Sequence, residues 1–299
     1  MPAIITTLRG VITPILLVAL LNAPLTAWSK NGFDLSDSLI SPTEILSGGP
    51  PKDGIPAIDN PKFLPGKTAV FLQPDDRVLG IEINGTAKAY PIRILNWHEI
   101  VNDRIGDNSF AVTYCPLCGT GVAFSAVLKD QMLNFGVSGL LYNSDVLLYD
   151  RNTQSLWSQI MGQAISGQLA GQKLTLLPLS HTTWSAWLRD HPQTLVLSTE
   201  TGIQRNYNRD PYAGYEKSRS LYFATSRKAP NTYHPKERVL GLQIGSSFKA
   251  YPFIELNRAG KSSFKDKLNG MEYLVKWDSE NQSGNIFDAT GTMIPSGLM

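Results

Sequence analysis

A stretch of twenty residues occurs twice in this chain and constrains its fold more than any other feature. Residues Arg77–Asn96 (RVLGIEINGTAKAYPIRILN) recur without a gap as Arg238–Asn257 (RVLGLQIGSSFKAYPFIELN), with eleven of the twenty aligned positions identical. The first copy holds Asn84-Gly85 between two apolar runs, a strong hairpin signal, and the second copy has Gly245-Ser246 there. The repeat therefore predicts two similar hairpin–helix–hairpin units.

The residues that differ between the copies indicate where the chemistry lies. At the same offset, Trp97-His98-Glu99 aligns with Arg258-Ala259-Gly260, and the Cys115-Pro-Leu-Cys118 segment aligns with residues 276–279. The only two cysteines of the chain and a nearby histidine thus occur in one copy alone. We interpret the first copy as the chemical half and the second as a structural partner.

The first copy predicts a simple order of elements. Strands Val78–Ile83 and Ala87–Tyr90 form the hairpin, and Pro91 suits the first position of a short helix that carries His98 and ends near Asn102. Two more strands, Phe110–Tyr114 and Val122–Leu128, flank the cysteine turn.

The middle of the chain predicts an antiparallel meander with one helix. The helix is expected from about Thr182 to Arg189, with Trp184, Trp187 and Leu188 packed in the core. Expected strands are Leu133–Val137, Val146–Tyr149, Leu156–Ile160 and Lys173–Leu177. The predicted fold class is α+β and β-rich, with duplicated hairpin–helix–hairpin units packed with a central antiparallel meander.

The chain is long enough for one sizeable domain. The expected boundaries are a signal peptide at 1–29, an extended Pro/Gly-rich segment at 30–69 and a single domain at 70–299, divided into copy 1 (about 70–128), a middle region (129–225) and copy 2 (226–299).

Composition excludes two classes of protein. An apolar fraction of 42% and a charged fraction of 17% describe a globular chain and exclude a disordered one. The net charge is +2 with acids and bases interspersed, so the basic face that nucleic-acid binding needs is missing.

The amino terminus predicts export. Arg9 precedes the apolar run Val11–Leu21, and Ala27-Trp28-Ser29 fits a small-x-small cleavage pattern. The run is short and contains Pro14, so no stable membrane span is expected after cleavage. A periplasmic or extracellular location follows, with an uncleaved membrane anchor as the alternative.

The cysteine turn favours a metal site. A strand, then Cys-Pro-x-Cys-Gly, then a strand is the sequence of a metal knuckle, because the turn supplies two thiolates at once. Further ligands must come from elsewhere: His98 is the first candidate and His181 the second, while Glu99 or Asn96 would orient His98. Thiolate with imidazole suits zinc or copper, in a structural, carrier or catalytic role.

Three alternatives stay open. The two cysteines could act as a periplasmic thiol–disulfide oxidoreductase, although Gly119-Thr120-Gly121 is poor helix sequence after a redox motif. They could form a small structural disulfide worth about 2 kcal/mol. The chain could instead be a non-enzymatic binding or envelope module that uses the aromatic, Asx-rich segments Tyr142–Asp145 and Tyr207–Tyr212. A small-molecule or thiol partner is consistent with the oxidoreductase and with the binding module.

Several longer motifs point to one family. They are Asn96–Asn102 (NWHEIVN, followed by Asp103), Val112–Gly119 (with YCPLCG) and Phe135–Asp145 (FGVSGLLYNSD), joined by segments around Asp150–Gln159 and His181–Trp184. By these residues the chain resembles DUF3179, a domain-of-unknown-function family of exported bacterial and archaeal proteins. The resemblance covers most of the chain from about Gly48 onward and implies export. It implies no reaction, substrate or cofactor.

Overall fold

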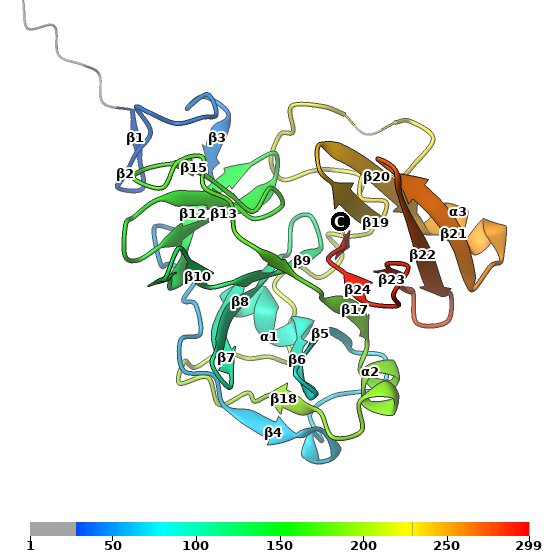
Figure 1. The fold of residues 1–299 in the computed structure, drawn as a ribbon. Helices are drawn as coiled ribbons and strands as arrows, with labels where there is room; N and C mark the ends of the chain where they lie inside the picture. The colour runs from blue at the N-terminus through cyan, green and yellow to red at the C-terminus, as the bar shows by residue number, and fades with distance from the viewer. Residues whose placement is uncertain (1–27, 229, 299) are drawn as a thin grey trace, which may run out of the picture.

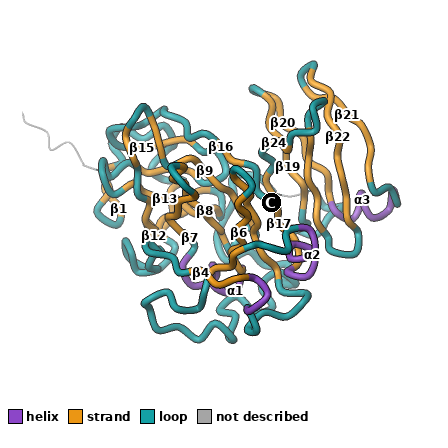
Figure 2. Tube along the Cα trace, turned by 60° about the horizontal axis from the view of Figure 1, so that its bottom comes forward, coloured by secondary structure: helices purple, strands orange, loops and turns teal. Residues whose placement is uncertain are grey.

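The computed structural model describes residues 28–228 and 230–298, and this part of the chain folds mainly into β-sheets with three short α-helices (Figure 1). The helices are α1 (Ile92–His98), α2 (Trp184–Asp190) and α3 (Phe253–Ala259), and Figure 2 shows how little of the chain they occupy. The predicted β-rich α+β class is confirmed. The predicted signal peptide lies outside the described residues except for its last two positions. None of the helices described is long and apolar enough to cross a bilayer.

The repeated hairpin lies in a five-stranded sheet with the order β17-β5-β6-β18-β4. Asn84 and Gly85 have φ angles of 52° and 76°, as a type I′ turn requires, so the predicted hairpin is confirmed. The strands are β4 (Phe63–Pro65), β5 (Arg77–Ile83), β6 (Thr86–Pro91), β17 (Ser180–Thr183) and β18 (Leu195–Leu197). A 3-10 turn at Gly66–Thr68 follows β4.

The helix after the hairpin is shorter than the sequence predicted. It begins at Ile92, directly after Pro91, and ends at His98. Glu99 then has a left-handed φ of 58°, and β7 begins at Ile100. The extension to Asn102 is wrong because the apolar residues Ile100 and Val101 face the core from a strand.

The cysteine turn lies in a second sheet with the order β20-β19-β25-β9-β8-β7, in which β16 also pairs with β9. Its strands are β7 (Ile100–Ile105), β8 (Asn108–Cys115), β9 (Thr120–Ser125), β16 (Leu176–Leu177), β19 (Val239–Ile244), β20 (Ser247–Pro252) and β25 (Gly297–Leu298). The sheet therefore joins strands from both repeat copies.

The meander forms a third sheet, β15-β14-β13-β12-β3, packed against β8 and β9 through buried apolar side chains. Its strands are β3 (Ile45–Ser47), β12 (Phe135–Tyr142), β13 (Asp145–Asp150), β14 (Leu156–Ser158) and β15 (Gln163–Ser166). The small pairs β1 (Ser29–Lys30) with β2 (Phe33–Asp34) and β10 (Val127–Leu128) with β11 (Gln131–Met132) lie outside it. The predicted extended segment thus contains short strands, and Leu35 and Ile45 within it are fully buried.

The second copy builds a sheet of its own, visible at the right of Figure 1 and again in Figure 2. Its order is β21-β22-β23-β24, formed by Ser263–Leu268, Met271–Asp278, Ser283–Phe287 and Met293–Ile294. A separate cluster of buried residues, including Phe253, Tyr273 and Trp277, holds it against β19 and α3.

We call β5 to β9 (residues 77–125) the first unit and β19 to β23 (residues 239–287) the second unit. Both units contain a hairpin, a seven-residue helix, a six-residue strand and an eight-residue strand in that order. Two extra residues follow α3, so β8 and β22 correspond with Cys115 opposite Asp278. The counterpart of the cysteine turn is therefore residues 278–282, two positions beyond the gapless alignment.

Candidate metal site

The two cysteines lie at either end of the tight turn between β8 and β9. Cys115 ends β8 and pairs with Thr120, while Gly119 has a φ of 67° that only glycine adopts without strain. Cys115 is buried, and Cys118 is partly buried on the turn. Both carry free thiols.

A second turn, between β12 and β13, brings a carboxylate to the thiols. Tyr142 pairs with Asp145 across Asn143 and Ser144, whose φ angles of 53° and 62° form a two-residue hairpin turn. The Cys118 thiol donates to Asp145 Oδ1 at 3.3 Å, and Cys115 Sγ lies 3.6 Å from the carbonyl oxygen of Ser144. One ligand atom each of Cys115, Cys118 and Asp145 lies within 4.8 Å of the other two.

The carboxylate has little to balance its charge. Asp145 is 3% exposed, and the backbone N–H of Ile160 donates to its Oδ2 at 3.1 Å. Within residues 28–228 and 230–298 it forms no ion pair with lysine or arginine. Burial raises the pKa of Asp145 to about 7, against which hydrogen bonds from Ile160 and Cys118 act only partly. Burial also raises the pKa of the Cys118 thiol well above its usual range.

Glu99 adds a second buried acid beside this cluster. Its side chain is 6% exposed, and burial, reinforced by the charge of Asp145, raises its pKa to about 8. It lines a cavity of about 430 Å³ together with Leu117 of the cysteine turn. Glu99 is also a non-glycine residue with a positive φ. That backbone conformation costs of the order of 1–3 kcal/mol, and residues that adopt it gather at functional sites. The sequence had suggested Glu99 only as a residue that orients His98.

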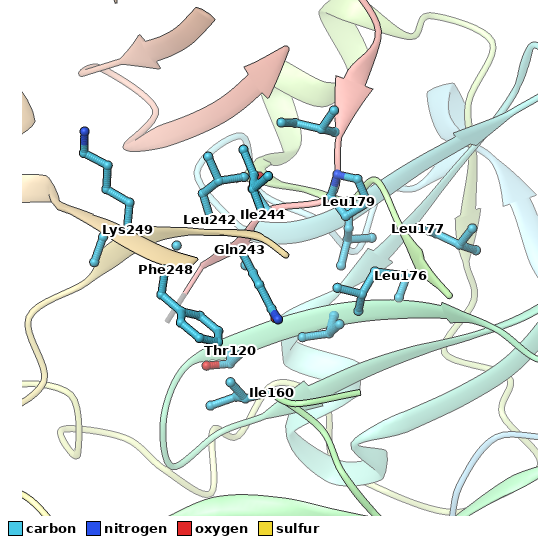
Figure 3. A pocket seen from close by; sticks show the side chains of 18 of the residues that line it. Thr120, Ile160, Leu176, Leu177, Leu179, Leu242, Gln243, Ile244, Phe248 and Lys249 are labelled. Atoms are coloured by element: carbon cyan, nitrogen blue, oxygen red, sulfur yellow. The ribbon is translucent and has the colours of Figure 1, made fainter. Parts of the chain in front are cut away.

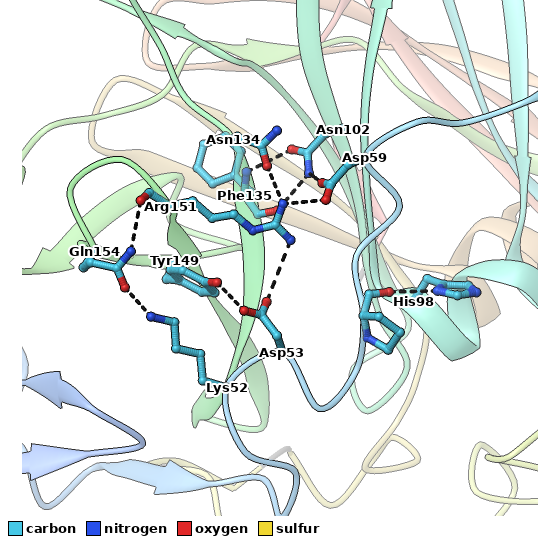
Figure 4. A network of polar contacts seen from close by, with 11 residues as sticks. Lys52, Asp53, Asp59, His98, Asn102, Asn134, Phe135, Tyr149, Arg151 and Gln154 are labelled. Atoms are coloured by element: carbon cyan, nitrogen blue, oxygen red, sulfur yellow. Dashed lines mark hydrogen bonds and ion pairs between the residues drawn. The ribbon is translucent and has the colours of Figure 1, made fainter. Parts of the chain in front are cut away.

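His98 is buried, and both of its ring nitrogens have hydrogen-bond partners. Nδ1 lies 2.8 Å from the carbonyl oxygen of Pro56, and Nε2 lies 2.7 Å from the hydroxyl of Tyr207. Figure 4 shows the segment that carries Pro56 held by Arg151, whose guanidinium bonds Asp59 at 2.6 Å. His98 thus joins α1 to this segment and to Tyr207. The structure does not bring it into the thiol cluster, and its role as a metal ligand stays a prediction without support from this geometry.

His181 lies on β17, across a small cavity from the cysteine turn. It is 6% exposed, and its ring meets Tyr114 edge-on with the centroids 6.3 Å apart. Cys118 and His181 line the same cavity of about 270 Å³, but His181 is outside the group of three ligand atoms. As a fourth ligand it too stays a prediction. Asn96, the other suggested neighbour of His98, instead donates to Asp210 Oδ1 at 2.9 Å.

Sequence reasoning missed Asp145 as a candidate ligand. It belongs to the Tyr142–Asp145 motif, which the sequence pattern marked as an Asx-rich turn and a cleft-lining segment. The sequence indicates a turn at each of the two motifs, but it does not show that the two turns meet.

A larger cavity of about 530 Å³ lies between β9 and the β19–β20 hairpin (Figure 3). Its walls are mainly Leu176, Leu179, Leu242, Ile244 and Phe248, and they contain no cysteine, histidine or acid. This cavity therefore offers mainly apolar surface, and Lys249, the one charged side chain among the described residues that line it, is paired with Asp266. The candidate chemistry stays at the cysteine turn.

Comparison with known proteins identifies a family. Neither the curated proteins nor the solved structures contain a match to the chain. The family model described as "Protein of unknown function (DUF3179)" matches residues 52–294, which include the cysteine turn, Asp145, Glu99 and both histidines. The chain therefore belongs to the DUF3179 family.

Proposed function

We propose that this protein binds one transition-metal ion, zinc by preference, through Cys115, Cys118 and Asp145. The observation that carries the proposal is the convergence of two thiols and a buried carboxylate within 4.8 Å from two separate turns. Clusters of exposed acids are common without a metal, but this one is largely buried and includes both cysteines of the chain. Buried charges are normally paired or coordinate a metal.

The donor set favours zinc over copper. Zinc accepts thiolate sulfur and carboxylate oxygen together, whereas copper(I) prefers sulfur and imidazole. With His98 engaged by Pro56 and Tyr207, the soft donors are limited to the two sulfurs, and copper is the weaker fit. Three protein ligands leave a fourth position for water, a substrate or His181.

Electrostatics support the same proposal. Asp145, Glu99 and the Cys118 thiol all have raised pKa values because burial opposes their charged forms. A divalent cation would supply the positive charge that these groups lack and would displace protons from its ligands. Glu99, which is near Asp145 and lines the adjoining cavity, would then be the group placed to hold or release a proton beside the ion.

The thiol–disulfide alternative is supported less well. A redox-active cysteine needs a lowered pKa, usually at a helix N-terminus or beside a cation. Cys118 follows a strand and precedes another, and its neighbour is the Asp145 carboxylate, which contributes to raising its pKa. These surroundings suit a metal ligand better than an attacking thiolate.

Elemental analysis of protein purified from the periplasm tests the proposal and the export that the amino terminus predicts. We expect about one zinc per chain, lost in Cys115→Ser and in Asp145→Asn. Asp278→Asn is the matched control, because Asp278 occupies the place of Cys115 in the second unit, and it should keep the metal. Metal retained after both cysteines are replaced would contradict the proposed metal site. Recovery of the protein from the cytoplasm alone would contradict export.

A further inference from the structure

The cavity of about 270 Å³ beside the cysteine turn has a strongly basic wall. Arg77, Arg238 and His181 form what we call its basic wall, and Cys118, Gly119 and Tyr114 line the cavity as well. Arg77 and Arg238 are the first residues of the two repeated segments, so both repeat copies contribute an arginine to the same cavity.

The two guanidinium groups lack carboxylate partners. Neither forms an ion pair in the part of the chain that the structure describes. Arg77 is held by the backbone carbonyl oxygens of His181 at 2.9 Å and Gln282 at 3.2 Å, and by that of Asn281. Burial, followed by the positive charge of Arg238, lowers the pKa of Arg77 to about 9. Two like charges are therefore kept close together without an ion-pair partner, and the more distant charges of Glu216 and Glu237 favour the charged form of Arg238.

The acids that line the cavity do not neutralise this wall. Asp210 accepts hydrogen bonds from Asn96 Nδ2 and from the backbone of Tyr212, both at 2.9 Å. Glu216 is exposed and reaches neither arginine within ion-pair distance. Lys236 is already saturated, because it donates to the carbonyl oxygens of Tyr215, Ser218 and Ser220.

Three buried nitrogen atoms of this wall have no hydrogen-bond partner. They are Arg77 Nε, Arg238 Nη2 and His181 Nδ1. His181 is more than nine-tenths buried, and the guanidinium of Arg238 is fixed 4.8 Å above the ring of Phe253. A buried donor left unpaired costs about 1–3 kcal/mol, so the two guanidinium N–H groups indicate a missing acceptor, and His181 Nδ1 adds a third donor when that nitrogen carries the ring proton.

We propose that this cavity binds the oxyanion group of a small molecule, a carboxylate or a phosphate, between Arg238 and His181. Guanidinium groups recognise both anions through paired N–H donors. The side chains of Arg238 and His181 are held in place before the ligand arrives. Burial raises the pKa of Tyr114, so its phenol stays neutral and adds no opposing charge. The volume is close to the lower limit for ligand pockets, which restricts the anion to a small molecule.

The anion site does not depend on the proposed metal, although Cys118 belongs both to the lining of this cavity and to the proposed metal ligands. Binding is therefore measured on metal-free full-length protein by calorimetry, in one arm with inorganic phosphate and in the other with acetate. We expect millimolar or tighter binding of at least one anion, and the arm that responds tells which oxyanion the site prefers.

The deciding variant is Arg238→Gln. It should weaken anion binding at least about tenfold, because a charge-assisted hydrogen bond and a facing charge are lost. Arg238→Lys should recover part of the affinity through its charge. Arg258→Gln is the matched control, since Arg258 is an exposed arginine of α3 paired with Glu255, and it should leave binding unchanged.

Two results would overturn the proposal: no heat with either anion in the unmodified protein, or equal affinity in Arg238→Gln. His181→Gln provides the second readout if Arg238→Gln does not fold, and it should weaken binding several-fold. Zinc content measured on the same variants separates this failure from failure of the metal site, because Arg238 is not among the metal ligands.

Discussion

The turn after β8 and the turn after β22 occupy the same place in two similar units, yet they are completed in different ways. In the second unit, the backbone N–H groups of Glu280 and Asn281 both donate to Asp278 Oδ1 at 3.0 Å, and Asn281 Nδ2 donates to Oδ2 at 2.7 Å. The Asp278 carboxylate is therefore satisfied by hydrogen bonds from within its own turn. In the first unit, Cys115 Sγ contacts the carbonyl oxygen of Ser144 at 3.6 Å. Cys118 Sγ contacts Asp145 Oδ1 at 3.3 Å and the carbonyl oxygen of Cys115 at 3.9 Å.

The difference separates what the scaffold needs from what a ligand needs. A turn that closes on itself stabilises a hairpin without any outside partner. A turn that presents two thiols to a carboxylate from another hairpin gains little from those contacts alone, since sulfur is a weak donor and the carboxylate is buried. The first unit therefore carries a group of candidate metal ligands that the second lacks.

The repeated Lys-Ala-Tyr-Pro tetrapeptide shows the opposite case, in which both units keep the same interaction. Lys88 Nζ and Tyr90 OH contact Asp103 at 2.8 and 2.6 Å, and Lys249 and Tyr251 contact Asp266 in the same way at 2.5 and 2.7 Å. The two units are therefore most alike where a lysine and a tyrosine of the hairpin bind an aspartate on the next strand.

The largest difference between the units should appear when these ion pairs are broken. Lys88 and Asp103 have side chains only 9% and 5% exposed, whereas Lys249 and Asp266 are 35% and 28% exposed. We expect Lys88→Met to lower the free energy of unfolding by about 3–5 kcal/mol, because it leaves a buried carboxylate unpaired. Lys249→Met should cost about 1 kcal/mol or less.

Urea unfolding of the two variants measures this contrast at one pH. Equal losses in both would show that the two units hold their aspartates in equivalent surroundings, against the difference in burial.

A smaller contrast is expected from pH. The pKa values of Asp145 and Glu99 are about 7 and about 8, above their ordinary 3.8 and 4.5. Between about pH 4 and pH 8 the unfolded chain has released these protons while the folded, metal-free chain still holds them. The unfolded state then binds fewer protons, so the free energy of unfolding should fall as pH rises through this window.

The second unit should behave with the opposite sign. Burial alone would raise the pKa of Asp278, but hydrogen bonds from Asn281 and Glu280 outweigh it and lower that pKa. Its contribution is present above the ordinary pKa and is lost as the solution becomes acidic. Urea unfolding with a chelator checks both signs when it extends below about pH 4. Glu99→Gln should flatten the loss towards high pH, and Asp278→Asn should instead reduce the loss in acid. A loss unchanged in Glu99→Gln would remove Glu99 as its source.

Sequence-based predictions were accurate where the interactions are local and failed where they join residues far apart in the chain. Asn84-Gly85 fixes its hairpin through two backbone angles, and the strand–turn–strand around Cys115 is likewise local. Asp145 could not be assigned in this way, because it reaches the thiols only through the packing of one sheet on another. His98 was favoured because it occurs in one copy only, yet its partner Tyr207 comes from a long loop without periodic sequence.

The smallest expected effect concerns the residue that ends the helix in each unit. Glu99 and Gly260 align in the repeat and have nearly the same φ, 58° and 61°. Nothing lies within 4 Å of a side-chain carbon added at Gly260, so Gly260→Ala tests backbone strain alone and should cost about 1 kcal/mol. Conversely, Glu99→Gly should be more stable than Glu99→Gln by about 1 kcal/mol, since both remove the acid but only glycine relieves the left-handed backbone. Thermal or urea unfolding of the three variants measures these differences. A neutral Gly260→Ala would mean that the helix end tolerates this conformation, and the left-handed Glu99 would then no longer indicate a position kept for function.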